Sequence, residues 1–230
     1  MLDAGDALVG SGKLGTKTQG EVIIAGMNLM GYDAMALGPR ELALGAAVLG
    51  QRMEEAAFPM LSANAVASGT SDLAAQPYVL VDVAGRRVGI LGLTSPPPER
   101  LAGFQVLDAE TAATRYVPEL REQGAELVIL LTNVEFRAAT ELASRVRGID
   151  LVIAAQPGQL PNSAVQVPGT GTLAVVAEQP LVRHSGRRVG RLAVMLGPDG
   201  VLSEPVWQSV PMGPELADDP EMKALLDRFR

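Results

Sequence analysis

Short apolar runs alternate with helix-like patterns along most of the chain, which favours an α/β fold. Residues 33–37, 60–63, 127–131 and 151–154 are largely apolar runs bounded by turn residues. Runs of this kind are typical of strands buried on both faces, in a sheet covered by helices. The amphipathic patterns between them predict helices over residues 19–30, 41–55, 109–123, 135–147 and 218–230.

Two further stretches predict antiparallel strands. Residues 78–83 and 87–93 flank a turn that contains Ala84-Gly85, which indicates a β-hairpin. A later meander is predicted from residues 172–177, 189–196 and 201–207, with a turn at 198–200. Helices that flank two layers of strands indicate an α/β sandwich.

The composition of the chain narrows its functional class. The 230 residues suit one domain, and with only 3% aromatic residues its core is built from aliphatic side chains. The net charge is -7 without clustered Lys or Arg, which argues against a nucleic-acid or anionic-membrane surface. No apolar stretch approaches the roughly 20 residues of a membrane span. The absence of cysteine excludes disulfides, zinc-cysteine sites and thiol catalysis.

Several segments, in order along nearly the whole chain, carry a resemblance to a known family. Gly5-Asp6 follows a short strand, where α/β folds place their chemistry. The sequence then runs through Glu-Val-Ile-Ile-Ala-Gly-Met-Asn-Leu-Met-Gly-Tyr-Asp-Ala-Met-Ala-Leu-Gly at 21–38. Together these segments resemble the calcineurin-like metallophosphoesterases, specifically the N-terminal domain of 5'-nucleotidases such as the bifunctional UDP-sugar hydrolase/5'-nucleotidase. The other matching segments are residues 58–64, 88–94, 124–132 and 148–153.

The resemblance implies a fold and a domain organisation. The family fold is a four-layer α/β/β/α sandwich of the metallo-dependent phosphatase type. Residue 1 falls within a family strand, so we expect this chain to lack the first strand. Residues 1–212 are then an N-terminally incomplete metallophosphoesterase-like domain, and residues 213–230 form a C-terminal linker helix.

The family binds two divalent metals that clamp a phosphate and activate a water molecule. Asp6 matches the carboxylate that bridges the two metals. The family motif Gly-Asn-His-Glu reads Gly38-Pro39-Arg40-Glu41 in this chain. Pro39 has no side-chain donor, and Arg40 places a permanent positive charge where the family has a histidine.

The remaining metal motifs are also altered. The family's Thr-His becomes Thr132-Asn133, and Gly-Gly-His-x-His becomes Ala-Ala-Gln-Pro-Gly at 154–158. Asn133, Gln156 and Gly158 are therefore degenerate metal positions, and only Asp6 is retained. The family's first motif, Asp-x-His, would lie upstream of residue 1. The resemblance thus implies neither a metal cofactor nor a catalytic residue in this chain.

Three functional hypotheses follow from this pattern. The first is a catalytically inactive domain, a pseudoenzyme retained for binding or assembly. The second is metal-independent binding of phosphate or a nucleotide by Asp6, Arg40, Asn133 and Gln156; alternatively, Arg40 faces solvent or pairs with a carboxylate. The third is residual hydrolysis of 5'-nucleotides, if upstream residues supply the first motif. The lone His184 matches no family motif and is read as a solvated loop residue.

Partners and location follow only from the resemblance. We expect another protein, a fused domain or a small anionic ligand as the partner, and no nucleic acid. An extracytoplasmic location is expected because relatives are usually exported.

Overall fold

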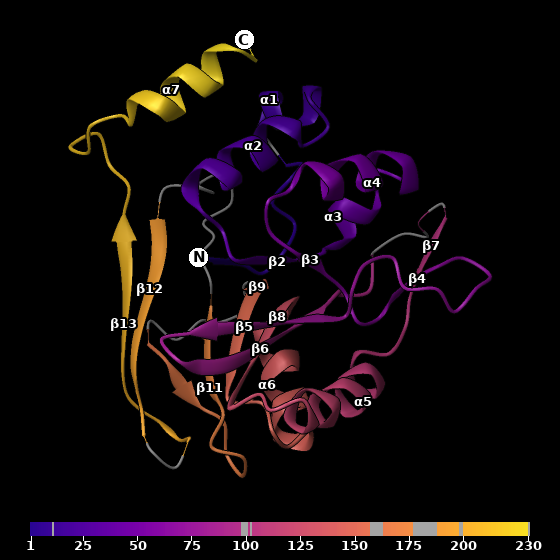
Figure 1. The fold of residues 1–230 in the computed structure, drawn as a ribbon, viewed down its shortest axis with the longest axis vertical. Helices are drawn as coiled ribbons and strands as arrows, with labels where there is room; N and C mark the ends of the chain where they lie inside the picture. The colour runs from indigo at the N-terminus through magenta and orange to yellow at the C-terminus, as the bar shows by residue number, and fades with distance from the viewer. Residues whose placement is uncertain are drawn as a thin grey trace.

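Two β-sheets lie face to face between two layers of helices in the computed structural model, which describes residues 1–10, 12–97, 101, 103–156, 163–176, 188–197 and 200–229 (Figure 1). This four-layer α/β/β/α arrangement is the predicted fold class. Each sheet buries one face against its helices and the other face against the second sheet, so three apolar clusters hold the four layers together.

The smaller sheet is parallel, with strand order β1-β2-β3. Its helices lie on the side away from the larger sheet (Figure 1). Ile24, Met27, Met35 and Leu49 are among the buried residues that join these helices to the sheet. The strands are β1 (Leu2–Asp3), β2 (Ala34–Ala36) and β3 (Met60–Leu61), and the helices are α1 (Lys13–Lys17), α2 (Glu21–Met30), α3 (Pro39–Leu42) and α4 (Ala46–Glu55).

The larger sheet has six strands in the order β10-β11-β9-β8-β6-β5. Its four central strands are parallel, and the two edge strands pair antiparallel with their neighbours. Leu120, Leu130 and Leu142 belong to the cluster between this sheet and its two helices. The elements are β5 (Tyr78–Val83), β6 (Arg86–Leu93), α5 (Ala109–Glu122), β8 (Leu127–Glu135), α6 (Phe136–Arg145), β9 (Leu151–Gln156), β10 (Val165–Gln166) and β11 (Leu173–Val176).

The two sheets approach each other closely at Gly92 on β6. A Cβ atom on this residue would lie 2.5 Å from the Cβ and carbonyl oxygen of Leu61 on β3, which is too close for any side chain. Glycine therefore lets the backbone of one sheet touch the other. Around this contact, Ala36, Ile90 and Leu131 fill the space between the sheets.

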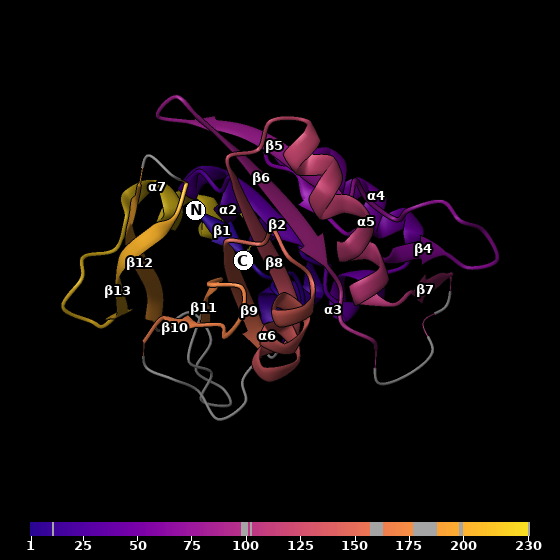
Figure 2. The same cartoon turned by 90° about the horizontal axis from the view of Figure 1, so that it is seen from below.

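Two hairpin-like pairs extend the sandwich at its opposite sides (Figure 2). One is β4 (Ala65–Ala67) with β7 (Phe104–Val106), and the other is β12 (Arg188–Leu196) with β13 (Leu202–Pro211). The last helix, α7 (Pro220–Asp227), lies beside α2 (Figure 1). Among the described residues, no helix combines the length and apolarity needed to cross a bilayer.

Most predicted elements are confirmed. The four apolar runs form β2, β3, β8 and β9, and residues 78–83 and 86–93 form the predicted hairpin. Helices α2, α5, α6 and α7 lie within the ranges predicted for them. The domain boundary at residue 212 stays a prediction; α7, beyond it, packs on α2.

Two predictions were wrong. Residues 173–176 do not join a meander, because β11 pairs in parallel with β9 in the six-stranded sheet while β12 and β13 pair only with each other. All four β11 residues are buried, as suits a central strand. The predicted helix 41–55 is two helices, α3 and α4, separated at Gly45, whose φ of 80° is incompatible with a continuous helix.

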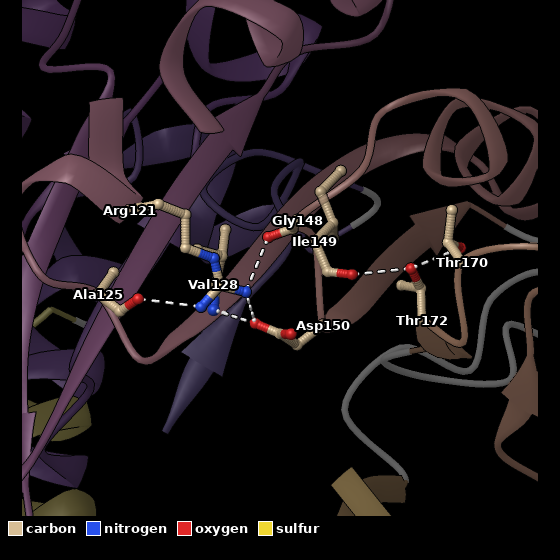
Figure 3. A network of polar contacts seen from close by, with 8 residues as sticks. All are labelled: Arg121, Ala125, Val128, Gly148, Ile149, Asp150, Thr170 and Thr172. Carbon is tan, nitrogen blue, oxygen red and sulfur yellow. Dashed lines mark hydrogen bonds and ion pairs between the residues drawn. The ribbon is translucent and has the colours of Figure 1, made fainter. Parts of the chain in front are cut away.

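A polar network lies at the end of the larger sheet where β8 and β9 begin (Figure 3). Arg121, in the last turn of α5, donates to the carbonyls of Ala125 at 2.9 Å and Gly148 at 3.0 Å, and it pairs with Asp150. The Asp150 carboxylate also accepts the N–H of Val128 at 2.6 Å. One guanidinium thus joins the loops that enter β8 and β9. Burial raises the pKa of Asp150, although Val128 and Arg121 oppose that shift.

We expect Arg121→Ala to lower the free energy of unfolding by about 2–3 kcal/mol, because it leaves a half-buried carboxylate and two carbonyls without their donor. Urea denaturation followed by circular dichroism measures this change. The matched control is Arg137→Ala, since Arg137 makes only an exposed pair with Glu141 on α6. That control should change stability by less than about 0.5 kcal/mol. Equal effects of the two substitutions would contradict the role given to Arg121.

Candidate functional site

The candidate site lies where parallel strands of both sheets end. Asp6 follows β1, Pro39 and Arg40 follow β2, and Asn133 lies near the end of β8. Carboxyl ends of neighbouring parallel strands share one edge of a sheet, and α/β folds bind ligands at that edge. Gln156 is the last residue of β9, and its backbone pairs with Glu135 of β8. Gly158 and His184 lie outside the described residues.

Asp6 and Asn133 meet at Gly38. A Cβ atom on Gly38 would lie 2.2 Å from Oδ1 of Asp6 and 2.3 Å from Nδ2 of Asn133. Both side-chain atoms therefore occupy the space beside the Cα atom of Gly38. The φ of Gly38 is −107°, which any residue can adopt. Gly38 is therefore required for space, since any side chain here would displace both polar groups.

The turn at the start of α3 fixes the position of Asp6. Oδ1 of Asp6 accepts the backbone N–H of Arg40 at 2.9 Å, and the N–H of Asp6 donates to Oε2 of Glu41 at 2.8 Å. Asp6 itself has a φ of 64°, a left-handed conformation that Asp tolerates better than most residues. Both its backbone and its carboxylate are thus held by the segment that follows β2.

Glu41 is completely buried and accepts three backbone hydrogen bonds. Its donors are the N–H groups of Asp6 at 2.8 Å, Gly38 at 2.8 Å and Leu8 at 3.0 Å. Burial and, to a smaller extent, the nearby Asp6 carboxylate raise the pKa of Glu41 to about 7, while the three N–H donors oppose that shift. Glu41 therefore ties the loop after β1 to the loop after β2.

The side chain of Asn133 is fixed by Ser95. The backbone N–H of Ser95 donates to Oδ1 of Asn133 at 2.7 Å, which identifies the oxygen and turns the amide nitrogen toward Asp6. Asn133 is fully buried, and within the described part of the chain its Nδ2 has no hydrogen-bond partner. An amide nitrogen is a hydrogen-bond donor and does not ligate a cation.

Arg40 presents its side chain to solvent. The residue is exposed, and its guanidinium makes no ion pair with any other described residue. Of the alternatives for Arg40, pairing of its side chain with Asp6 or Glu41 is not seen; only its backbone N–H contacts Asp6. Pro39, by contrast, is buried.

A second buried network lies behind the site. Asn64 accepts the N–H of Thr94 at 2.8 Å and donates to the carbonyls of Thr94 at 2.9 Å and Leu107 at 3.0 Å. The Thr94 hydroxyl donates to the carbonyl of Leu37 at 2.8 Å. Its oxygen also lies 2.7 Å from the hydroxyl oxygen of Ser62, with which it shares a hydrogen bond. These residues fix the ends of β2, β3 and β6 relative to one another.

Sequence reasoning missed the roles of Glu41, Ser95, Asn64 and Thr94. For Glu41 there was a signal, because a Glu three residues after Gly38 at a helix start is the spacing of a capping box. For the others, the signal was only that polar residues directly follow apolar strands. Among the residues that the structure describes, no three His, Cys, Asp or Glu side chains converge to form a metal site.

Known proteins of similar sequence and structure define the family. The trifunctional nucleotide phosphoesterase YfkN of Bacillus subtilis is 27% identical over the whole chain, and the 5'-nucleotidase of Rattus norvegicus is 35% identical over 66% of it. A 5'-nucleotidase precursor structure from Thermus thermophilus superposes on 99% of the chain with a TM-score of 0.85 and 28% identity. The chain's homologues and structural neighbours are 5'-nucleotidases and calcineurin-like phosphoesterases.

The likeness covers only part of each relative. The chain spans 18% of the Bacillus phosphoesterase, 28% of the rat 5'-nucleotidase and 48% of the Thermus chain. It resembles the N-terminal domain of these 5'-nucleotidases. No protein-family model matches the chain. The fold and family expected from the sequence are thus confirmed, whereas the roles of the individual site residues stay predictions.

We expect the stability contributed by Glu41 to decrease as the pH rises. Its pKa is about 7 in the folded chain and near 4.5 when unfolded, so the folded state holds the proton more strongly between these values. The contribution is fully present below pH 4.5 and is lost as the pH rises through 7. Between pH 5 and 8 the unfolding free energy of the natural protein, relative to that of Glu41→Gln, should fall by about 2–3 kcal/mol.

Urea denaturation of both proteins at pH 5, 6, 7 and 8 measures this difference. The Glu41→Gln variant is its own control for all other titrating groups, because it changes only this one. A difference that does not vary with pH would mean that the three N–H donors keep Glu41 ionised throughout.

Proposed function

We propose that this chain is a catalytically silent member of the 5'-nucleotidase family, retained for binding or assembly. The observation that carries the proposal is the arrangement around Asp6. Its carboxylate faces the N–H of Arg40 and the amide nitrogen of Asn133, so hydrogen-bond donors lie where a metal site needs further electron-pair donors. The scaffold elements around it match those of relatives.

The chemistry of these side chains does not fit a pair of dications. A divalent ion in a protein exchanges most of its hydration shell for anionic or imidazole donors. Around Asp6 the chain offers a proline at 39, an arginine at 40 and an asparagine whose oxygen already accepts a hydrogen bond. Glu41 is close, but both of its oxygens accept backbone N–H groups. Of Asp6 and Glu41, only Asp6 therefore has a carboxylate oxygen available to a metal at this point.

Loss of activity is a testable expectation. With Mn²⁺, Zn²⁺ or Mg²⁺, we expect the purified protein to hydrolyse AMP and 4-nitrophenyl phosphate at least about a thousandfold more slowly than YfkN of Bacillus subtilis. The reason is that bound metals supply both the nucleophile and the charge stabilisation in such reactions. Steady-state release of phosphate or nitrophenol measures this.

An Asp6→Asn variant is the control for that assay. Metal-dependent turnover that Asp6→Asn abolishes would overturn the proposal and would support residual hydrolysis, the third hypothesis. Turnover that Asp6→Asn leaves unchanged would come from a contaminating phosphatase and would leave the proposal standing.

A second candidate function is metal-independent binding of an anionic ligand. The exposed guanidinium of Arg40, which has no ion pair within the described residues, favours it, because guanidinium binds phosphate or carboxylate through two parallel hydrogen bonds. The buried Nδ2 of Asn133 nearby also lacks a partner there.

Calorimetry with a 5'-nucleoside monophosphate in the presence of a chelator tests this candidate. We expect Arg40→Ala to weaken binding about tenfold or more, since it removes a charge-assisted hydrogen bond. The matched control is Arg137→Ala, which removes another exposed cation, from α6. Unchanged affinity in Arg40→Ala would eliminate this candidate.

An extracytoplasmic location and a fused partner domain remain proposals as well. They are supported by relatives that are longer than this chain and by names such as the snake venom 5'-nucleotidase of Gloydius brevicauda. Secretion of the natural protein with a reporter fusion would test the location.

A further inference from the structure

A shallow groove of about 360 Å³ runs between α2 and α7 on the outer helical layer. Its lining is apolar in the middle, from Leu29, Ala224 and Leu225, and charged at the two ends of α7, from Glu221 and Arg228. Leu29 is 40% exposed, and the adjoining Met30 is 48% exposed. These two side chains extend the apolar surface at the α2 side of the groove.

Helix α7 is a firmly attached part of the fold. Leu225 is buried against the domain, and the thioether of Met222 lies 3.7 Å from the position of a Cβ on Gly26 of α2. The side chain of Asp219 caps the helix by accepting the N–H of Met222 at 2.8 Å. The helix is therefore held in a fixed orientation, and Glu221, Ala224 and Arg228 are exposed along the groove, on the flank of α7 beside the buried Leu225.

The exposed face of α7 is complementary to itself. Glu221 and Arg228 are seven residues apart, which is about two helical turns or roughly 10 Å along one face. Neither forms an ion pair with another described residue. Ala224, between them, is small enough to let a second helix approach closely. When two such helices pack antiparallel, each Glu221 lies opposite the other helix's Arg228.

We propose that the groove between α2 and α7 binds α7 of a second copy of this chain, antiparallel, about a twofold axis near Ala224. A twofold interface requires that residue i contacts residue j and that j contacts i, which the Glu221 and Arg228 pairs satisfy. Leu29 of each copy then packs against α7 of the other. An unrelated partner helix would need a matching charge pair of its own, whereas the second copy carries it already.

The dimer is expected to be weak. Stable interfaces bury more than about 1,000 Å² of surface, and the surface that this groove can bury is smaller than that. The charge pairs also lie at an exposed rim, where ion pairs contribute little. We therefore expect dissociation constants on the order of 0.01–1 mM, which weaken further as salt is raised. Sedimentation equilibrium of the intact protein, up to millimolar concentration, covers this range.

Charge reversal tests the pairing directly. Glu221→Arg places Arg opposite Arg, and Arg228→Glu places Glu opposite Glu, so each variant alone should dimerise at least tenfold more weakly than the natural protein. An equimolar mixture of the two variants restores both attractive pairs and should give a heterodimer. The control is Lys223→Glu, which reverses an exposed charge on another face of α7 and should leave association unchanged.

Three results would overturn the proposal: a natural protein that is monomeric up to millimolar concentration, single variants that dimerise like the natural protein, or a mixture that does not associate. Circular dichroism of each variant establishes that it is folded, which is expected because both side chains are exposed. The proposed loss of catalysis stands or falls separately, since neither Asp6 nor Asn133 lines this groove.

Discussion

The buried carboxylate of Glu41 holds together the two loops that form the candidate site. Glu41 accepts three backbone N–H groups, from Asp6, Leu8 and Gly38, and the bonds from Leu8 and Gly38 are buried. Without that acceptor the two buried N–H groups would be unpaired, at a cost comparable with a lost hydrogen bond. Glu41 also holds the backbone of Asp6 in its left-handed conformation, while the N–H of Arg40 holds its carboxylate.

The same edge of the molecule contains a second polar network. Asn64, Thr94 and Ser62 satisfy one another and the backbone at the ends of β2, β3 and β6. These bonds involve neither Asp6, Arg40 nor Asn133, so the strand ends are fixed by residues other than the candidate site residues. The fold and the chemistry placed on it can therefore vary separately.

The carboxylate of Asp6 accepts the backbone N–H of Arg40, and the surface of the domain offers a second region for contacts. The chain covers less than half of the Thermus 5'-nucleotidase, and its outer helical layer exposes apolar side chains beside a helix with opposite charges at its ends. The proposed self-association through α7 and the proposed silence at Asp6 are independent of each other, because they use different residues on different elements.

The sequence by itself determined most of the longer strands and helices, because apolar periodicity reports burial directly; it did not predict the short elements α1, β4, β7 and β10. It also identified, through the family resemblance, that Asp6, Arg40 and Asn133 gather at one edge. Only the tertiary structure decided that β11 pairs with β9, that Asn133 turns its nitrogen toward Asp6, and that Glu41 holds three amides. The physical reason is that, apart from the local bond between Gly38 and Glu41, these outcomes depend on hydrogen-bond partners more than 20 residues away, which a local pattern of hydrophobic and polar residues does not contain.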